Sequence, residues 1–75
     1  MEHHSPIRWY NPTLEDFEWC EVPLTDEQAL QMLDGSSHSP TCTRTYREWR
    51  GLGASIGAAL MRAGEAAKKE GDDAR

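Results

Sequence analysis

The stretch that decides the fold is residues 43–69, TRTYREWRGLGASIGAALMRAGEAAKK, the longest segment with a helical period. At helical spacing, its apolar and small residues share one side and most of its charged residues share the other. The inner side would hold Tyr46, Trp49, Gly53, Ile56, Leu60, Ala63 and Ala67, and the outer side Arg44, Arg47, Glu48, Arg62, Glu65 and Lys69. This pattern predicts one amphipathic helix, or two helices in line.

The beginning of this segment carries a stronger helix signal than its middle. Thr45 and Glu48 have the spacing of a capping box, in which a hydroxyl and a carboxylate bind two free amides of the first turn. A helix is therefore expected to begin near residue 43. Three glycines follow between residues 51 and 57, and each costs about 1 kcal/mol relative to alanine inside a helix. We expect order to weaken there.

A second helix is predicted upstream, over residues 26–33. Thr25 and Gln28 have capping-box spacing, and two acids follow Thr25 where the helix dipole favours negative charge. Gly35 stands where a helix commonly ends in a left-handed conformation.

Two short strands are predicted at the N-terminal end, over residues 7–10 and 17–22, separated by the turn signal Asn11-Pro12. Alternation places Phe17 and Trp19 on one face of the second strand and its acids on the other. The strands would form a hairpin with a loop of five or six residues. Because a lone hairpin is barely stable in water, we expect its aromatic face to be covered.

With 75 residues, the chain has room for one domain with a small core. The prediction is an α+β fold, a small single domain with an N-terminal β-hairpin, two helices and a disordered C-terminal tail. Residues 1–6 would be flexible, 7–50 a compact mini-domain and 51–75 weakly ordered to disordered. From Gly64 onward, small and charged residues are expected to bury too little surface to order themselves.

Charge is distributed unevenly over a chain of net charge -5. Residues 1–43 hold eight acids against Arg8 alone, a net charge of -7, whereas residues 44–62 carry +3. The two parts could neutralise each other within the fold. Alternatively, the acidic part could be a docking face for a basic partner.

The sequence predicts a cytoplasmic monomer. The first ten residues lack the apolar segment of a signal peptide, and the longest nearly apolar run, residues 52–61, is about half the length that crosses a bilayer. The two cysteines, Cys20 and Cys42, are expected to stay reduced in that compartment.

No metal, cofactor or catalytic activity is predicted. Cys20, His38 and Cys42, with His3 or His4, are residue types that bind zinc, but their spacing matches no zinc-binding pattern. A nucleophile beside a base, in a pocket, is not evident in the sequence.

Arg44, Arg47 and Arg50 recur every three residues beside Tyr46 and Trp49, which keeps a DNA-binding function open. A helix with three arginines could contact phosphates or enter the major groove, as in helix-turn-helix regulators. Two features argue against DNA binding. The net charge of the chain is negative, and the predicted connection between the two helices has about ten residues rather than three or four.

The remaining interpretation is a protein-binding module, since Trp, Tyr and Arg supply most interface hot spots. The predicted partner-binding residues are Ile7, Arg8, Trp9, Tyr10, Glu15, Asp16, Glu18, Arg44, Arg47 and Arg50.

In size, acidity, the aromatic stretch Ile7-Arg8-Trp9-Tyr10 and the low-complexity tail, the chain resembles small phage-encoded inhibitors of bacterial RNA polymerase. The resemblance implies binding to the polymerase or its initiation factor, with inhibited or redirected initiation, or antitermination. DNA mimics and nuclease inhibitors have the same general profile and stay as alternatives.

Overall fold

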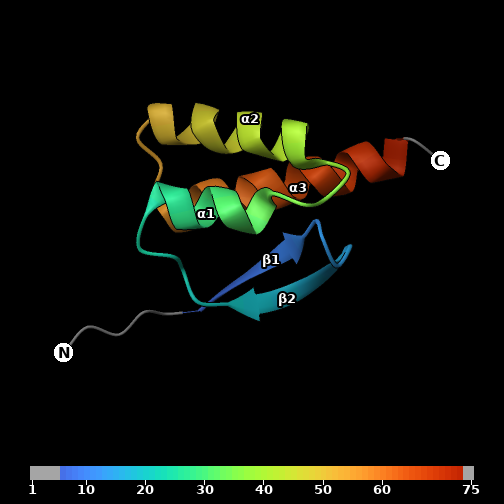
Figure 1. The fold of residues 1–75 in the computed structure, drawn as a ribbon, viewed down its shortest axis with the longest axis horizontal. Helices are drawn as coiled ribbons and strands as arrows, with labels where there is room; N and C mark the ends of the chain where they lie inside the picture. Colours follow the sequence, from blue (N-terminus) through green and yellow to red (C-terminus); the bar gives the residue numbers. More distant parts are fainter. Residues whose placement is uncertain (1–5, 74–75) are drawn as a thin grey trace.

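The computed structural model describes residues 6–73, which form a two-stranded antiparallel sheet and three helices (Figure 1). In chain order the elements are β1 (Ile7–Asn11), β2 (Asp16–Cys20), α1 (Asp26–Leu33), α2 (Ser39–Gly51) and α3 (Ile56–Asp73). The prediction of a small α+β domain with an N-terminal hairpin is confirmed. Within residues 6–73, no helix combines the length and apolar character needed to cross a membrane.

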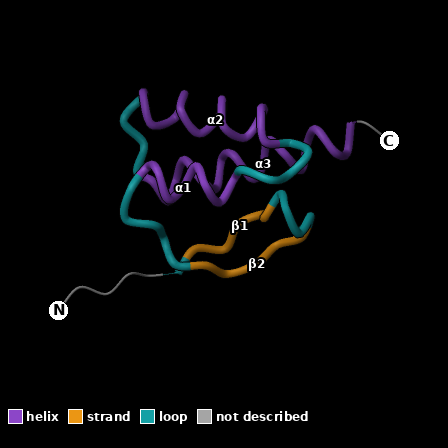
Figure 2. Tube along the Cα trace, viewed as in Figure 1, coloured by secondary structure: helices purple, strands orange, loops and turns teal. Residues whose placement is uncertain are grey.

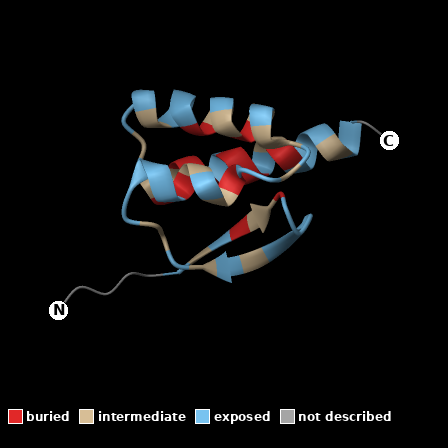
Figure 3. Cartoon of the chain, viewed as in Figure 1, coloured by how far each residue is buried: buried red, intermediate tan, exposed pale blue. Residues whose placement is uncertain are grey.

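Helix α3 lies at the centre of the fold, packed against β1 on one side and α2 on another. Figure 2 shows the hairpin on one side of the helices, with α1 between the hairpin and α2 in this view. The largest buried side chains are those of Trp9, Leu33, Tyr46 and Leu60, so the hairpin and all three helices contribute to one core. In Figure 3 the buried segments of α2 and α3 face each other, and β1 contributes a buried segment toward the helices.

The hairpin has the predicted position but a shorter turn. β2 ends at Cys20 rather than at residue 22, and only residues 12–15 separate the strands. Asn11 organises the turn, since its side-chain Oδ1 accepts a hydrogen bond from the Thr13 amide at 2.9 Å. Its main-chain oxygen also accepts one from the Glu15 amide at 2.8 Å. Glu15 has φ 56°, a left-handed conformation that non-glycine residues rarely adopt.

The prediction that Phe17 and Trp19 face the core was wrong. Trp9 is 1% exposed and pairs with Glu18, so the covered face of β2 is the one that carries Glu18. Phe17 and Trp19 are 41% and 67% exposed on the opposite face. Alternation determines which residues share a face of a strand, but it does not determine which face the helices cover.

Helix α1 has the predicted bounds and caps. The Thr25 hydroxyl accepts a hydrogen bond from the Gln28 amide at 3.1 Å, and the Gln28 side chain accepts one from the Leu24 amide at 3.0 Å. Gly35 has φ +94° just beyond the helix, as expected for a left-handed terminus.

Helix α2 begins at Ser39, four residues before the predicted start. Pro40 falls within the predicted connection of about ten residues, but proline fits the first helical turn, where its missing N–H has no partner to lose. The capping-box spacing of Thr45 and Glu48 therefore lies in the interior of α2 and marks no terminus.

The prediction of a weakly ordered to disordered segment from residue 51 onward was wrong for Ile56–Asp73, which forms the longest helix described. Helices α2 and α3 are not in line, because the chain reverses at Gly53, whose φ is +99°. One face of α3 is buried and consists of small residues and one leucine: Gly57, Ala59, Leu60, Ala63, Gly64 and Ala67. Small side chains bury little area, but they allow β1 and α2 to approach closely, and this packing adds to the helix propensity of the alanines.

The C-terminal turns of α3 are attached to the beginning of α2. Glu70 accepts a hydrogen bond from the Thr41 hydroxyl, and its Oε1 lies 2.7 Å from His38 Nδ1. The Thr41 hydrogen bond, followed by the His38 hydrogen bond, lowers the pKa of Glu70. Residues 1–5 and 74–75, which include parts of the predicted flexible N-terminus and tail, lie outside the described residues.

Candidate functional site

The face of the hairpin turned away from the helices carries a cluster of large side chains that we call the aromatic face: Arg8, Tyr10, Phe17 and Trp19. The strand register creates it, because Tyr10 pairs with Phe17 and Arg8 pairs with Trp19. Directly paired residues of an antiparallel sheet project on the same side, so these four side chains share one surface.

Phe17 is at the centre of the aromatic face. Its ring meets that of Tyr10 edge-on, with centroids 5.4 Å apart and an angle of 78° between the planes. The Arg8 guanidinium lies 4.6 Å from the Phe17 centroid, a favourable cation–π distance. These contacts hold Arg8, Tyr10 and Phe17 in defined positions while Trp19, 67% exposed, projects into solvent. The face is therefore organised before any partner binds.

The predicted N-terminal site residues are divided between the two faces of the hairpin. Arg8 and Tyr10 belong to the aromatic face, but Tyr10 is half-buried and, like Ile7, packs partly against the core, whereas Trp9 is fully buried. A partner can therefore contact Arg8 directly but cannot reach the Trp9 side chain without unfolding the hairpin.

The predicted acidic residues lie along the turn and β2. Glu15 is exposed in the turn, and Asp16 begins β2, where its Oδ1 accepts a hydrogen bond from the Phe17 amide at 2.8 Å. Glu18 is half-buried on the face opposite the aromatic face and accepts a hydrogen bond from Asn11 Nδ2 at 2.8 Å. All three carboxylates are thus near one strand, but they do not form one compact cluster.

Sequence reasoning did not include Phe17 and Trp19 among the site residues, because it expected the helices to cover them. The strands give opposite signals: the more apolar face of β1 carries Trp9, whereas the more apolar face of β2 carries Phe17 and Trp19, and these lie on opposite sides of the hairpin. The covered face depends on how α3 packs on the hairpin, and the Gly64 contact with Tyr10 joins residues that are far apart in the sequence.

The predicted arginine row is interrupted at Arg50. Its Nε donates to Asp26 Oδ1 at 2.7 Å, and its Nη1 donates to the Ala54 carbonyl at 2.8 Å. Asp26 also accepts a hydrogen bond from the buried Tyr46 hydroxyl at 2.6 Å. Arg50 thus joins α1, α2 and the turn before α3, and its charge is paired within the fold.

This network changes the acidity of two of its members. The Arg50 hydrogen bond, followed by that of Tyr46, lowers the pKa of Asp26. Burial, with a further contribution from Asp26, raises the pKa of Tyr46 to about 12. Both groups therefore keep their ordinary charge states at neutral pH.

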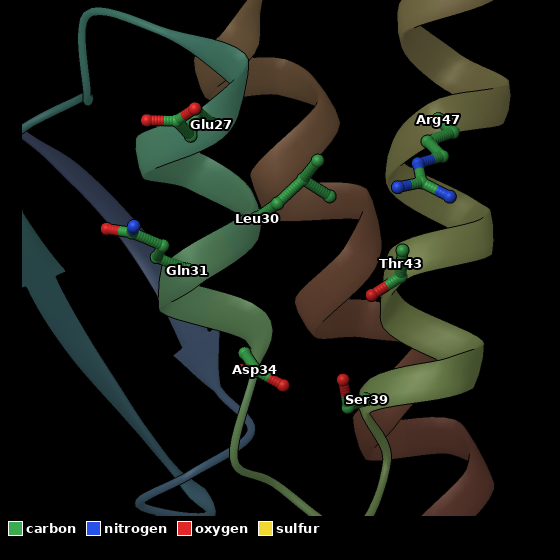
Figure 4. A pocket seen from close by; sticks show the side chains of 7 residues that line it. All are labelled: Glu27, Leu30, Gln31, Asp34, Ser39, Thr43 and Arg47. Carbon is green, nitrogen blue, oxygen red and sulfur yellow. The ribbon is translucent and has the colours of Figure 1, made fainter.

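Arg47 lines a shallow groove of about 320 Å³ between α1 and α2, with Glu27, Leu30, Gln31, Asp34, Ser39 and Thr43 (Figure 4). Arg44 is exposed, and it contributes to the lowered pKa of Glu70 on α3. The three predicted arginines thus occupy three different environments on one helix.

The connection between α1 and α2, residues 34–38, is shorter than the predicted ten residues. In Figure 1 both helices run along the long axis of the molecule. Helix-turn-helix motifs instead cross at about 90–120°. The arrangement of α1 and α2 therefore does not follow that motif.

Both cysteines are free thiols. Cys42 is buried, and its Sγ donates a weak hydrogen bond to the Ala63 carbonyl at 3.5 Å. Burial, with a smaller contribution from Glu70, raises the pKa of Cys42 to about 11. Within residues 6–73 no three His, Cys, Asp or Glu side chains are grouped as metal ligands, and His3 and His4 lie outside that range.

Comparison with known proteins found no similar chain: no family model matches the sequence, and no curated protein or solved structure is significantly similar to it.

Proposed function

We propose that this chain is a protein-binding module that attaches to a larger protein through its aromatic face. The observation that carries the proposal is the exposure of Trp19 and Phe17 beside Arg8 on an ordered hairpin. Exposing large aromatic side chains to water is unfavourable, and these residue types dominate interface hot spots. A rigid face also loses less conformational entropy when it binds.

The partner we propose is bacterial RNA polymerase, and the module regulates it by inhibiting initiation or promoting antitermination. This part of the proposal is supported by the resemblance of the sequence to small phage-encoded polymerase inhibitors. The aromatic stretch that carries the resemblance supplies Arg8 and Tyr10 to the aromatic face. The acids of the turn and β2 would add charge complementarity to a basic surface of the polymerase.

A binding experiment with purified bacterial RNA polymerase tests this function. The tagged chain is immobilised, and the retention of polymerase is measured for the wild type, Trp19→Ala and Leu52→Ala. Leu52 is the matched control, because it is 79% exposed at the end of α2, outside the aromatic face. Trp19→Ala is expected to weaken binding at least about tenfold, as for a hot-spot residue, with no change for Leu52→Ala. No retention of polymerase by the wild type, or equal binding by all three chains, would overturn the proposal.

DNA binding is the competing function, and the exposed positions of Arg44 and Arg47 favour testing it. The Arg44→Ala and Arg47→Ala variants would then reduce retention of a DNA duplex, and affinity for the duplex would fall steeply with salt. Retention of DNA without polymerase would replace the proposed function with this one.

A further inference from the structure

The outer edge of β1 is closed by α3. A Cβ built on Gly64 would lie 2.3 Å from the Tyr10 carbonyl oxygen and 3.2 Å from the Tyr10 nitrogen. Both main-chain groups of Tyr10 therefore point toward α3 rather than toward β2. The Asn11 carbonyl points the other way, since it accepts the Glu15 amide across the turn.

The open edge of the sheet follows from this orientation. In an antiparallel pair, residues whose main-chain groups point inward alternate with residues whose groups point outward, and paired residues behave alike. Tyr10 pairs with Phe17 and Arg8 pairs with Trp19, so the main-chain groups of Phe17 and Trp19 point away from β1. The Phe17 amide is bound by the Asp16 side chain, whereas the Phe17 carbonyl and both main-chain groups of Trp19 face outward.

No described helix and no other described strand covers this edge. Among the described elements, β2 lies beside β1 alone, and Figure 1 shows β2 on the side of the hairpin away from α3. Natural sheets protect exposed edges with charged side chains, proline, a bulge or a short strand, because an open edge pairs with other strands. The β2 sequence, DFEWC, has no proline, and its register with β1 is continuous. Its charges, Asp16 and Glu18, are both acidic, so they disfavour an acidic strand at this edge but not a basic one.

We propose that β2 accepts an extended segment of the partner protein as the third strand of the sheet, a segment in which Lys or Arg alternates with apolar residues. This inference rests on the proposed function and specifies its binding mode. The apolar residues of the segment lie beside Phe17 and Trp19 on the aromatic face. Its basic residues lie on the other face, beside Asp16 and Glu18.

The negative charge of β2 favours pairing with a basic segment over pairing with β2 of a second copy of this chain. Four acids lie in or next to β2, at Glu15, Asp16, Glu18 and Glu21, and Arg8 is the only basic residue on the hairpin. A self-paired β2 centred on Glu18 would place this carboxylate directly opposite its own copy. Like charges in that position destabilise a sheet, whereas a cationic strand turns the same residues into favourable pairs.

Chemical synthesis with ligation at Cys20 gives full-length chains in which one main-chain amide is methylated. N-methylation of Trp19 removes the outward donor of β2 and keeps every side chain. N-methylation of Arg8 is the matched control, because Arg8 is paired with Trp19 and its amide points to the opposite edge. The probe is a library of random dodecapeptides, selected on the immobilised wild-type chain.

The selected peptides are expected to alternate basic and apolar residues, to bind the N-methyl-Trp19 chain at least about tenfold more weakly, and to bind the N-methyl-Arg8 chain as they bind the wild type. If a methylated chain fails to fold by circular dichroism, amide exchange of the unmodified protein answers the question. The Trp19 amide must then exchange at least about tenfold more slowly in the peptide complex.

No enrichment, peptides without alternation, equal effects of both methyl groups, or an unprotected Trp19 amide would each overturn the inference. The selection uses no polymerase, so the two proposals fail separately. If the chain retains polymerase but selects no peptide, the proposed function stands and the third-strand binding mode is wrong. If the chain selects alternating peptides but retains no polymerase, the open edge stands and polymerase is not the partner.

Discussion

A side chain at residue 64 would collide with the main chain of Tyr10, since a Cβ on Gly64 would lie 2.3 Å from the Tyr10 carbonyl oxygen. Cβ atoms in real proteins essentially never approach another atom this closely. Helix α3 can therefore contact β1 at this distance only because residue 64 is a glycine. This contact closes one edge of the sheet and, together with the contact of Gly57 with Ile7 and Val22, holds the hairpin against α3.

We expect Gly64→Ala to lower the free energy of unfolding by about 2 kcal/mol, because overpacking against a main-chain atom outweighs the gain in helix propensity. Gly51→Ala is the matched control. It lies in α2 with no atom within 4 Å of the added Cβ, and should raise the free energy of unfolding by about 0.5 to 1 kcal/mol. Urea unfolding followed by tryptophan fluorescence measures both. Equal effects of the two variants would contradict the packing argument.

The same glycines explain why the sequence predicted disorder where the structure has a helix. Helix propensity counts Gly57 and Gly64 as destabilising, and the small and charged residues after Gly64 were expected to bury too little surface to become ordered. Their benefit depends on what lies opposite: Gly57 faces Val22 and Gly64 faces Tyr10, both far away in the sequence. A local sequence pattern contains no information on such contacts. The sequence therefore predicted the helical period of α3 but not that α3 is a stable helix.

Two threonines with the same capping-box spacing are expected to respond differently to alanine. Thr25→Ala removes the hydroxyl that binds the Gln28 amide and should cost about 1 kcal/mol. Thr45→Ala should cost less or stabilise the protein, because Thr45 lies inside α2, where alanine has the better helix propensity. Thermal unfolding of both variants under one buffer condition checks this. A larger loss for Thr45→Ala would mean that α2 begins near residue 43 after all.

Acid should destabilise the fold through Asp26 and Glu70. Their hydrogen bonds, mainly to Arg50 and to Thr41 respectively, lower both pKa values below the ordinary 3.8 and 4.5. A carboxylate with a lowered pKa in the folded state contributes stability above its ordinary pKa and loses it as pH falls through the lowered value. The unfolding midpoint is thus expected to stay level above about pH 5 and to decrease below about pH 4.

Thermal unfolding of the wild type, Asp26→Asn and Glu70→Gln between pH 2 and 7 measures this dependence. Each variant should have a lower midpoint at pH 7 and a weaker loss of midpoint on acidification. A variant whose acid profile parallels that of the wild type would show that its carboxylate is not responsible.

The left-handed conformation of Glu15 should cost stability that a better-suited residue restores. Asparagine tolerates a positive φ more readily, so Glu15→Asn is expected to raise the free energy of unfolding by about 0.5 to 1 kcal/mol. Thr13→Asn in the same turn is the control, since no left-handed φ is recorded at Thr13 and no comparable gain is expected. Equal gains would indicate an effect of asparagine in the turn rather than relief of strain at Glu15.

The candidate site was only partly predictable, for a reason specific to hairpins. Composition and the aromatic stretch directed attention to Arg8 and Tyr10, but the two strands give opposite signals, because Ile7 and Trp9 lie on one face of the hairpin and Phe17 and Trp19 on the other. Trp9 is in the core because α3 packs on that side of the hairpin, where Gly57 lies close to Ile7 and Gly64 close to Tyr10. Arg50 likewise belongs to a row of arginines that suggested a binding surface, but in the structure its side chain binds Asp26 and the Ala54 carbonyl within the fold.

Truncation tests whether the C-terminal half of α3 stabilises the core. In the folded protein Cys42 is buried and its pKa is about 11, so iodoacetamide at pH 8 should leave it unmodified. A chain ending at residue 64 loses Ala67 from the core and Glu70 from its contacts with α2. We expect that chain to be alkylated at Cys42 within minutes, as shown by peptide mass mapping.

A chain ending at residue 71 keeps both residues and should protect Cys42 as the full-length protein does. If the shorter chain also protected Cys42, the residues beyond 64 would be dispensable, as the sequence alone had suggested.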